Sequence, residues 1–268
     1  MKTFRRMTDF PGFGPWTLVF FIFLYAPIGI LVAYSFNAGR FAMIWEGFSF
    51  AWYGAVMAND DIRLAAINSL IVATAAAPLA TLIAIFAALA LVRGGEFRGR
   101  ALSGGLVVLP LLVPEIVTAV ATLIFFTQIG LKLGLGNIII AHTVFCIPFA
   151  FMPIRAALEG MDPALEQAAC DLHATPAQAF RHITLPQLAP GILSGFMLAF
   201  VISIDDFIIT LMVAGAGSTT LPVYIYSMIR QGVTPEVNAV STLLLLVSIF
   251  FVTAYWLVSR RRSGDFSG

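Results

Sequence analysis

Long apolar segments constrain this chain more than any other feature of its sequence. A helix that crosses the hydrocarbon core of a bilayer needs roughly 20 predominantly apolar residues, and six segments of that kind are present. They are about Trp16–Phe36, Ile67–Val92, Ala101–Phe126, Asn137–Ala157, Gly191–Val213 and Val237–Ser259. The composition agrees, since 60% of the residues are hydrophobic and only 11% are charged, unlike a soluble domain. The sequence therefore predicts an all-α, polytopic membrane protein with one six-helix transmembrane domain over residues 16–259.

The basic residues predict how the six segments are oriented. If both termini are cytoplasmic, eleven of the 15 Lys and Arg residues lie in inside segments and four lie in outside segments. Cytoplasmic loops of membrane proteins carry such an excess of basic residues. We therefore expect a multi-pass membrane protein, with cytoplasmic ends at residues 1–15 and 260–268 and a cytoplasmic loop at 158–190. The net charge of +1 gives no indication of a nucleic-acid partner.

The cytoplasmic loop contains a polar stretch, Glu166–Pro186, enclosed by apolar sequence. Asp162-Pro163 and Thr175-Pro176 each place a capping side chain before a proline, which favours the start of a helix. Two short helices are therefore expected, the first over about Pro163–Leu172. Its apolar face would consist of Leu165, Ala168, Ala169 and Leu172. Such a face suits a groove on a partner protein, and the alternative is a helix packed on its own bundle or on the membrane surface.

Three carboxylates lie inside predicted transmembrane segments. A carboxylate at the centre of a bilayer costs about 2.5–3.5 kcal/mol on insertion scales, so it usually faces a cavity or a partner. Glu115 is 14 residues beyond Ala101, and Asp205 is 14 residues beyond Gly191, so continuous helices would place both about 20 Å from the cytoplasmic edge. A matching depth favours a cation pathway. Since successive helical residues differ by about 100°, either Asp205 or Asp206 would face that pathway, and the alternative is that all three carboxylates are structural.

The sequence gives little support for catalysis by this chain. A P-loop needs a lysine after its glycines, and neither Lys2 nor Lys132 has that setting. No HExxH spacing or serine nucleophile elbow is present. We therefore expect no enzyme activity and no resident metal or cofactor. His142 is interpreted as hydrogen bonded to a neighbouring helix, as polar side chains in membrane helices often are, with a functional role as the alternative.

Aromatic residues gather in the predicted outer segments. They are Trp45, Trp52, Tyr53, Tyr224 and Tyr226. Aromatic faces bind ammonium groups, but tyrosine and tryptophan also concentrate at bilayer interfaces. The interfacial interpretation is the favoured one.

The polar loop contains Gln167-Ala168-Ala169, then position 173, and then Ile183-Thr184-Leu185-Pro186. This spacing resembles that of the EAA loop in permease subunits of type I ATP-binding-cassette importers. Other segments are similar to permeases of the spermidine/putrescine importers. These are Leu24–Pro27, Tyr34–Asn37, Leu109–Pro110, Pro114–Glu115, Ser203–Asp206, Thr219–Pro222 and Gly232–Ala239.

Two positions depart from the family pattern. Gln167 stands where the loop usually has a glutamate, although Glu166 is beside it, and His173 stands where it has a glycine. Glycine permits a positive φ at the break between the two short helices, and histidine adopts that conformation less readily. We therefore expect either a slightly strained turn at His173 or a different geometry there.

The resemblance implies a MetI-like permease subunit of the bacterial inner (plasma) membrane, with a defined set of partners. These would be a second, homologous permease subunit, two ATPase subunits that bind ATP and Mg²⁺, and a periplasmic substrate-binding protein. The ATPase-coupling residues implied are Leu165, Glu166, Gln167, Ala168, Ala169, Asp171, Leu172 and His173, and the pathway residues are Glu115, Asp205 and Asp206. The expected substrate is a small cation, foremost a polyamine such as putrescine or spermidine. A quaternary ammonium or sulfonium osmolyte is the alternative substrate, and an ion-coupled secondary transporter, which would have inverted repeats and broken helices, is the alternative function.

Overall fold

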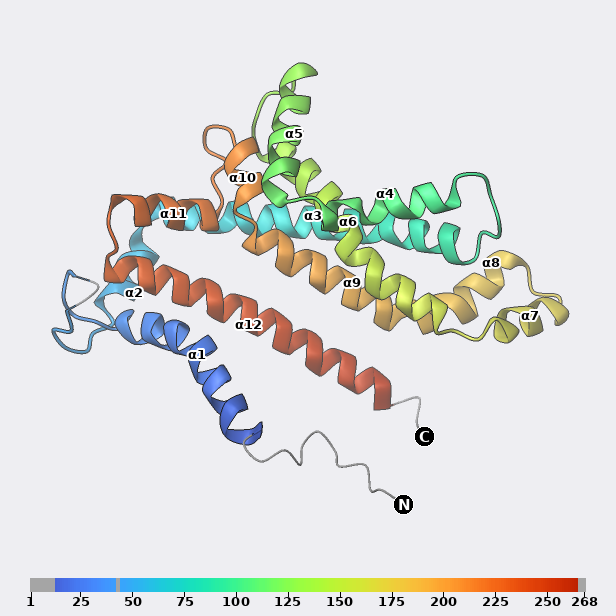
Figure 1. The fold of residues 1–268 in the computed structure, drawn as a ribbon, viewed down its shortest axis with the longest axis horizontal. Helices are drawn as coiled ribbons and strands as arrows, with labels where there is room; N and C mark the ends of the chain where they lie inside the picture. The colour runs from blue at the N-terminus through green and yellow to red at the C-terminus, as the bar shows by residue number, and fades with distance from the viewer. Residues whose placement is uncertain (1–12, 42–43, 265–268) are drawn as a thin grey trace. The chain divides into compact units, whose positions relative to one another are not determined.

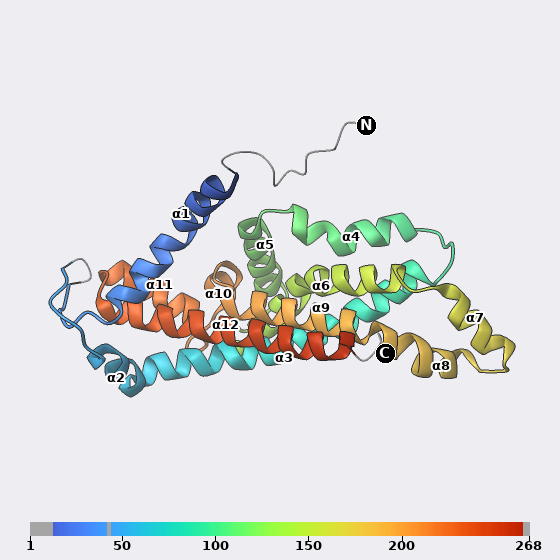
Figure 2. The ribbon, with the colours of Figure 1, turned by 90° about the horizontal axis from the view of Figure 1, so that it is seen from below.

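The computed structural model describes residues 13–41 and 44–264. The described residues are mostly helical (Figures 1 and 2). They divide into two units, one comprising residues 13–41, 44–60 and 227–246 and the other residues 61–226 and 247–264. Within residues 13–41 and 44–264, five helices are long and apolar enough to cross a membrane, or up to six if a bent pair counts as one span. This agrees with the six-span prediction.

The first unit contains α1 (Phe13–Tyr34) and α2 (Ala51–Ala58). None of the residues in Gly14–Tyr34 is buried, so the apolar surface of α1 is open to lipid or to another subunit. The segment that follows α1 is ordered by the fully buried Asn37. Its amide nitrogen donates to the carbonyl oxygens of Phe41 and Ile44, and its Oδ1 accepts from the backbone of Gly39 and Glu46.

The second unit is built around α3 (Asp60–Val92), α6 (Leu135–Glu159) and α9 (Leu185–Asp205). Small side chains dominate the buried face of α3. Ala73, Ala76, Ala77, Ala80, Ala84 and Ala88 are all fully buried there. Small residues let membrane helices approach closely, and larger side chains of α6, among them Phe151 and Ile154, complete the same core.

The contact between α6 and α9 depends on two glycines. A Cβ atom at Gly191 would lie 2.5 Å from the Ala157 Cβ, and one at Gly195 would lie 2.6 Å from the Ala150 carbonyl oxygen. The two glycines are four residues apart, so they share one helix face. The backbones of α6 and α9 therefore touch directly, as in other small-xxx-small membrane helix pairs.

The third apolar segment is not the continuous helix that its length predicts. It divides into α4 (Arg100–Leu112) and α5 (Glu115–Gln128), which meet at an angle of 109°. Pro114 lies at the break, where it has no N–H to donate and disfavours a helical residue before it. Val113 is accordingly extended, at φ −88° and ψ 132°.

The fifth apolar segment also differs from the prediction at both ends. The spanning helix begins at Pro176, because α8 (Pro176–Ala179) continues through the π-helical turn η2 (Phe180–Thr184) into α9. At the other end α9 stops at Asp205, and the chain resumes as the short α10 (Ile208–Val213). The second short helix of the polar loop is therefore an extension of the transmembrane helix.

The remaining helices are α7 (Pro163–Asp171), α11 (Leu221–Gln231) and α12 (Pro235–Gly264). Both views place α7 and α8 beyond one end of α6 and α9 (Figures 1 and 2). The polar loop therefore extends beyond the ends of α6 and α9 in the second unit.

Candidate functional site

The break after α9 positions the side chain of Asp206. Its backbone is extended, at φ −61° and ψ 129°, and its side chain turns back to begin α10. Asp206 Oδ1 accepts from the backbone N–H of Thr210 at 2.9 Å and from the Thr210 hydroxyl at 3.1 Å. The Asp206 side chain is only 2% exposed.

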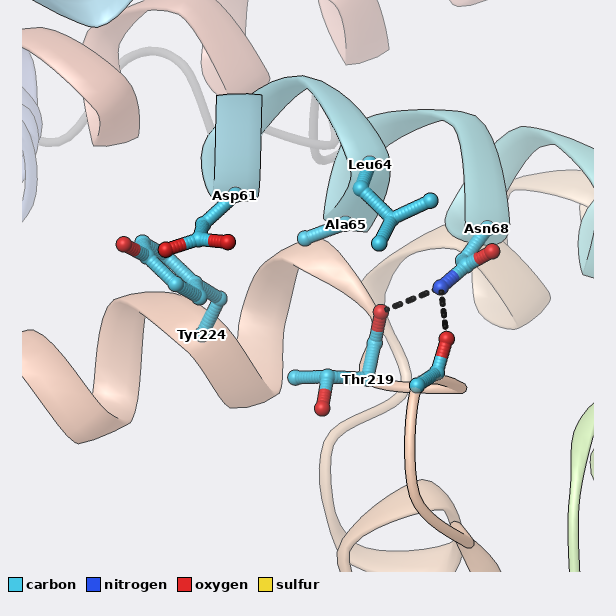
Figure 3. A pocket seen from close by; sticks show the side chains of 7 residues that line it. Asp61, Leu64, Ala65, Asn68, Thr219 and Tyr224 are labelled. Carbon is cyan, nitrogen blue, oxygen red and sulfur yellow. Dashed lines mark hydrogen bonds between the residues drawn. The ribbon is translucent and has the colours of Figure 1, made fainter. Parts of the chain in front are cut away.

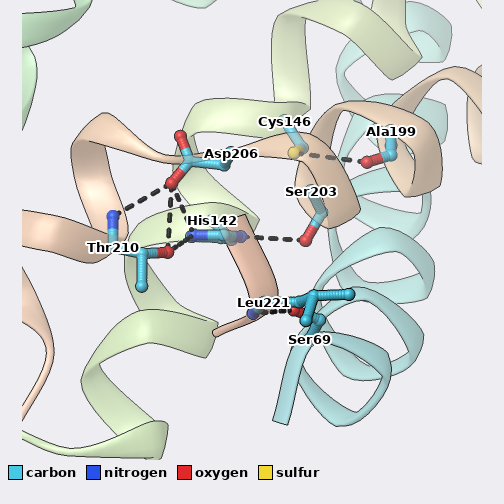
Figure 4. Close-up of polar contacts among 8 residues, drawn as sticks. All are labelled: Ser69, His142, Cys146, Ala199, Ser203, Asp206, Thr210 and Leu221. Carbon is cyan, nitrogen blue, oxygen red and sulfur yellow. Dashed lines mark hydrogen bonds and ion pairs between the residues drawn. The ribbon is translucent and has the colours of Figure 1, made fainter. Parts of the chain in front are cut away.

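His142 of α6 connects this break to two other helices (Figure 4). Its Nε2 lies 3.1 Å from Asp206 Oδ1 and 2.9 Å from Thr210 Oγ1, and its Nδ1 lies 2.9 Å from Ser203 Oγ. Because an ionised carboxylate only accepts hydrogen bonds, the network assigns a proton to Nε2, and in the neutral ring the Ser203 hydroxyl donates to Nδ1. The interpretation of His142 as bonded to a neighbouring helix is confirmed.

Ser203, His142 and Asp206 are connected in the order of a hydrolytic triad, but they lack access to a substrate. Ser203 is 3% exposed, and it does not line either of the two cavities described below. A nucleophile has to meet its substrate within hydrogen-bonding range of its base. The arrangement therefore fastens three helices together and offers no exposed nucleophile.

The three predicted carboxylates lie at two helix breaks, and the two aspartates have different hydrogen-bond partners. Glu115 is the first residue of α5, directly after the break at Pro114. Asp206 Oδ2 is buried and has no hydrogen-bond partner among the described residues. Asp205 is exposed and accepts a hydrogen bond of 3.4 Å from Ser248 of α12.

The prediction that Glu115 and Asp205 lie at the same depth assumed continuous helices, and the structure has breaks at both places. Glu115 begins a helix just after a break, and Asp206 follows the end of one. Like charges near one another repel in a medium of low dielectric constant, and a cation is attracted by each of them. A cation beside Glu115 would therefore be attracted by both carboxylates.

The polar loop has both of the helix starts that its sequence predicts. Asp162 Oδ1 accepts from the backbone N–H of Ala164 at 2.9 Å and so caps α7. Thr175 and Gln178 form a reciprocal capping box at the start of α8, with Gln178 Oε1 accepting from the Thr175 backbone at 2.8 Å. Each short helix is thus fixed by its own local sequence.

His173 adopts the conformation for which a glycine was expected. Its φ is 68°, and it is the one non-glycine residue with a positive φ among those that the structure describes. The N–H of Ala174 donates to the carbonyl of Ala169, and that of His173 donates to the carbonyl of Cys170. These bonds complete a Schellman-type end of α7. The turn therefore keeps a left-handed geometry, with the strain that a side chain adds there.

The predicted coupling residues fall into an exposed group and an inward group. Leu165, Gln167, Ala168, Asp171, Leu172 and His173 are exposed. Ala169 is buried, which corrects its expected place on the docking face, and Glu166 is half-buried and turned toward Arg93. Helical spacing predicts which residues of α7 share a face, but it does not predict which of them are buried against the rest of the unit.

A cavity of about 170 Å³ lies beside the start of α3 (Figure 3). Its lining residues are Asp61, Leu64, Ala65, Asn68, Gly217, Thr219 and Tyr224. The buried Asn68 donates to the carbonyl oxygens of Gly217 and Thr219 at 3.1 and 3.0 Å, and Ser69 Oγ accepts from the N–H of Leu221 at 2.8 Å. This polar pair was not among the predicted site residues, and two adjacent polar residues inside an apolar segment were the available signal.

A second cavity, of about 210 Å³, separates part of the polar loop from α3. It is lined by Leu89, Arg93, Glu166, Cys170, Pro176, Ala179, Phe180 and Thr184. Among the described residues, no group of three or more His, Cys, Asp or Glu side chains has the arrangement of a metal site.

Comparison with known proteins connects these features to transport. Residues 80–263 match the family described as "Binding-protein-dependent transport system inner membrane component". The chain is 39% identical over 258 residues to the putrescine transport system permease protein PotI of Escherichia coli (strain K12), with 92% of each chain covered. It is 37% identical over 255 residues to the spermidine/putrescine transport system permease protein PotC of the same strain, covering 95% of this chain and 96% of that one.

The fold has a solved counterpart. A chain in the crystal structure of a bacterial ABC transporter involved in the import of the acidic polysaccharide alginate superimposes with a TM-score of 0.70. The superposition covers 92% of this chain and 93% of that chain, at 20% sequence identity. At that identity the match concerns the fold alone.

Proposed function

Since this chain belongs to the family of binding-protein-dependent transport system inner membrane components, we propose that it forms half of the pathway by which an ATP-driven importer takes up a small polyamine. It is a multi-pass permease subunit of the inner membrane. The observation that carries the substrate class is that carboxylates lie at two helix breaks within apolar segments, with Glu115 at the start of α5 and Asp205 and Asp206 at the end of α9. Putrescine and spermidine are named for relatives with 39% and 37% identity, and both are cations.

The three carboxylates have different parts in this proposal. Glu115 is half-buried and Asp205 is exposed, so these two can meet an ammonium group directly. Asp206 is held by His142 and Thr210, and its charge attracts a cation from behind Glu115. Each helix break frees backbone polar groups that a continuous helix would pair internally. Such irregular backbone is tolerated in a membrane protein where it is buried in protein or lines a water-filled cavity.

The exposed face of α7 would provide the coupling surface. Leu165, Ala168 and Leu172 lie exposed on this short helix, and an apolar helix face of this kind fits a groove on another protein. In the proposed complex that groove belongs to an ATPase subunit. ATP binding would close the ATPases, move α7 and switch access to the pathway, and ATP hydrolysis would reset it.

The full complex would contain two homologous but different permeases, two ATPase subunits and a periplasmic binding protein. ATP and Mg²⁺ would bind to the ATPases, and this chain would carry out no covalent chemistry. Both of its termini would lie in the cytoplasm, which puts α7 on the same side as the ATPases. The eleven-to-four distribution of basic residues supports that orientation.

Uptake of radiolabelled putrescine and spermidine tests the pathway. Glu115→Gln and Asp205→Asn each remove one negative charge with little change in size, and each is expected to reduce uptake on the order of tenfold, as a loss of about 1.4 kcal/mol does. Glu159→Gln, at an exposed carboxylate that pairs with Arg155 in α6, should leave uptake unchanged. Normal uptake by a Glu115→Gln/Asp205→Asn double variant present at wild-type amounts would contradict the proposed pathway.

The substrate itself is tested on the cognate binding protein. Polyamines are expected to bind it and to stimulate ATP hydrolysis by the complex, whereas a quaternary ammonium compound such as choline is not. Stimulation by choline and none by polyamines would replace the proposed substrate with the alternative one.

A further inference from the structure

The attachment of α7 to the rest of the chain rests on few contacts. Ala169 is the only buried residue in α7, and it has only a methyl group to pack. A cavity of about 210 Å³ lies beside the helix, between it and α3. Apolar packing alone therefore holds α7 weakly, because the free energy of packing scales with the apolar area buried.

Polar contacts supply the missing connection through Arg93, which directly follows α3. Its Nη2 donates to the carbonyl oxygens of Leu158 and Met161 at 3.3 and 3.4 Å. These carbonyls lie at and just beyond the C-terminal end of α6, where a cation is favoured by the helix dipole. Arg93 therefore joins the ends of α3 and α6.

The same guanidinium group extends the connection to α7. Arg93 Nε is buried and lies 3.4 Å from Glu166 Oε2 as an ion pair. The two side chains are 24% and 25% exposed, so water screens this pair less than it would screen a surface pair. Glu166 is thereby turned away from the exposed face of α7 and toward the bundle.

The last contact runs from Glu166 to η2. The Thr184 hydroxyl donates to Glu166 Oε1 at 2.9 Å, and Thr184 is only 3% exposed. Because η2 continues into α9, this bond reaches the transmembrane helix that ends at Asp205. Arg93, Glu166 and Thr184, which we name the Arg93 clamp, thus connect α7 to α3, α6 and α9.

We propose that the Arg93 clamp positions α7 so that a displacement of this helix moves α3, α6 and α9 together. Arg93 and Glu166 are then positioning residues of the importer, and Glu166 acts inside the permease and not on the ATPase surface. This inference rests on the proposed function, because it assigns a role in ATP-driven coupling. Loss of the clamp would let α7 follow the ATPases without carrying the transmembrane helices along.

The test measures substrate taken up per ATP hydrolysed by the importer complex in proteoliposomes, supplied with its loaded binding protein. Arg93→Gln and Glu166→Gln each break the ion pair, and Glu166→Gln retains an acceptor for Thr184. Each is expected to lower uptake per ATP by about five- to tenfold, within the range of allosteric coupling. The double variant should be no worse than Arg93→Gln alone, because Arg93→Gln already removes the ion pair that Glu166→Gln removes, along with the bonds of Arg93 to Leu158 and Met161.

The matched control is the Arg155–Glu159 pair of α6, which is exposed and has a 2.7 Å contact. Arg155→Gln and Glu159→Gln should keep the wild-type ratio. A purely structural effect at position 93 or 166 would lower uptake and ATP hydrolysis in proportion, and the ratio would stay constant. A constant ratio, or effects that multiply in the double variant, would overturn the proposal.

Hydrogen exchange of the same complex provides a readout that does not depend on transport. Amides of α7 should exchange on the order of tenfold faster in Arg93→Gln, as a loss of about 1.4 kcal/mol of local stability predicts, with those of α5 and α10 unchanged. Unchanged protection of α7 would refute the clamp even in a preparation without uptake. If the wild-type complex neither takes up polyamines nor hydrolyses ATP in response to them while α7 exchange responds to Arg93→Gln, the proposed function fails and the clamp stands.

Discussion

At the scale of single residues, His142 of α6 contacts three polar residues at the break that follows α9. One imidazole ring contacts Ser203 at the end of α9, Asp206 in the break and Thr210 in α10. A buried polar group costs free energy unless it is hydrogen bonded, and here the histidine, Oδ1 of the aspartate and the two hydroxyl groups are hydrogen bonded to one another. These buried hydrogen bonds therefore stabilise the break between α9 and α10.

Replacing His142 should destabilise the permease. His142→Ala would remove a donor from the buried Asp206 and a partner from Ser203, at a cost of about 1–3 kcal/mol. Thermal unfolding of the purified complex in detergent should show a lower midpoint. His182→Ala, at an exposed histidine whose Nδ1 lies 3.0 Å from the Gln178 carbonyl, is the control and should change stability by less than about 0.5 kcal/mol. Equal midpoints for the two variants would show that the network contributes no stability.

His173 allows a second prediction at this scale. A side chain in the left-handed region is strained by roughly 1–2 kcal/mol, and a β-branched residue is the least tolerated there. His173→Gly should therefore match or exceed the wild type in stability, and His173→Val should fall below it by about 1 kcal/mol or more. The order is measured by thermal unfolding of the complex, and a valine variant as stable as the glycine variant would contradict the left-handed turn.

At the scale of helices, the sequence predicted lengths and starts better than breaks. Apolar length indicates a span, and Asp162 and Thr175 indicate helix starts, because these signals lie in consecutive residues. The break at Val113 and Pro114 also has a local signal in its proline, but apolar sequence on both sides concealed it. The break at Asp206 has no local signal of that kind, because it depends on His142, which is distant in sequence and adjacent only after folding.

The carboxylate site was predictable in part for the same reason. Glu115, Asp205 and Asp206 were selected because ionisable groups in apolar segments are rare and functional. Their grouping could not be derived, since it required the 109° bend between α4 and α5. The structure then separates the two aspartates, with Asp206 toward α6 and Asp205 toward Ser248.

The two alanines of α7 give a prediction at the scale of this helix. Ala168 is exposed and Ala169 is buried, so the same substitution should have different effects at the two positions. Ala169→Phe would overpack the contact with the bundle at a cost of about 1–3 kcal/mol. Ala168→Phe should change stability by less than about 0.5 kcal/mol and should weaken binding of the ATPase subunit.

The measurements for this pair are the unfolding midpoint of the purified permease and the amount of ATPase that copurifies with it. The docking assignment predicts a normal midpoint and reduced ATPase for the Ala168 variant. Copurification at the wild-type level with Ala168→Phe would mean that the ATPase binds elsewhere.

At the scale of the whole molecule, the orientation in the membrane decides whether α7 can meet an ATPase. Cys170 lies on the exposed surface of α7, and Cys146 is fully buried in α6. A membrane-impermeant maleimide should therefore label Cys170 in inside-out vesicles stripped of the ATPase subunits, and it should not label it in right-side-out vesicles. Cys170→Ser should abolish the signal. Labelling from the outer side would reverse the proposed topology.

The glycine contact between α6 and α9 has a consequence for how sequences of this kind can diverge. Side chains that face lipid can be exchanged for others of similar hydrophobicity, because fluid acyl chains adapt to any shape. Gly191 and Gly195 have no such freedom, since one added carbon would lie 2.5 or 2.6 Å from an atom of α6. A lineage could replace much of the outer surface of this permease and still be held, at these two positions, to the smallest residue available.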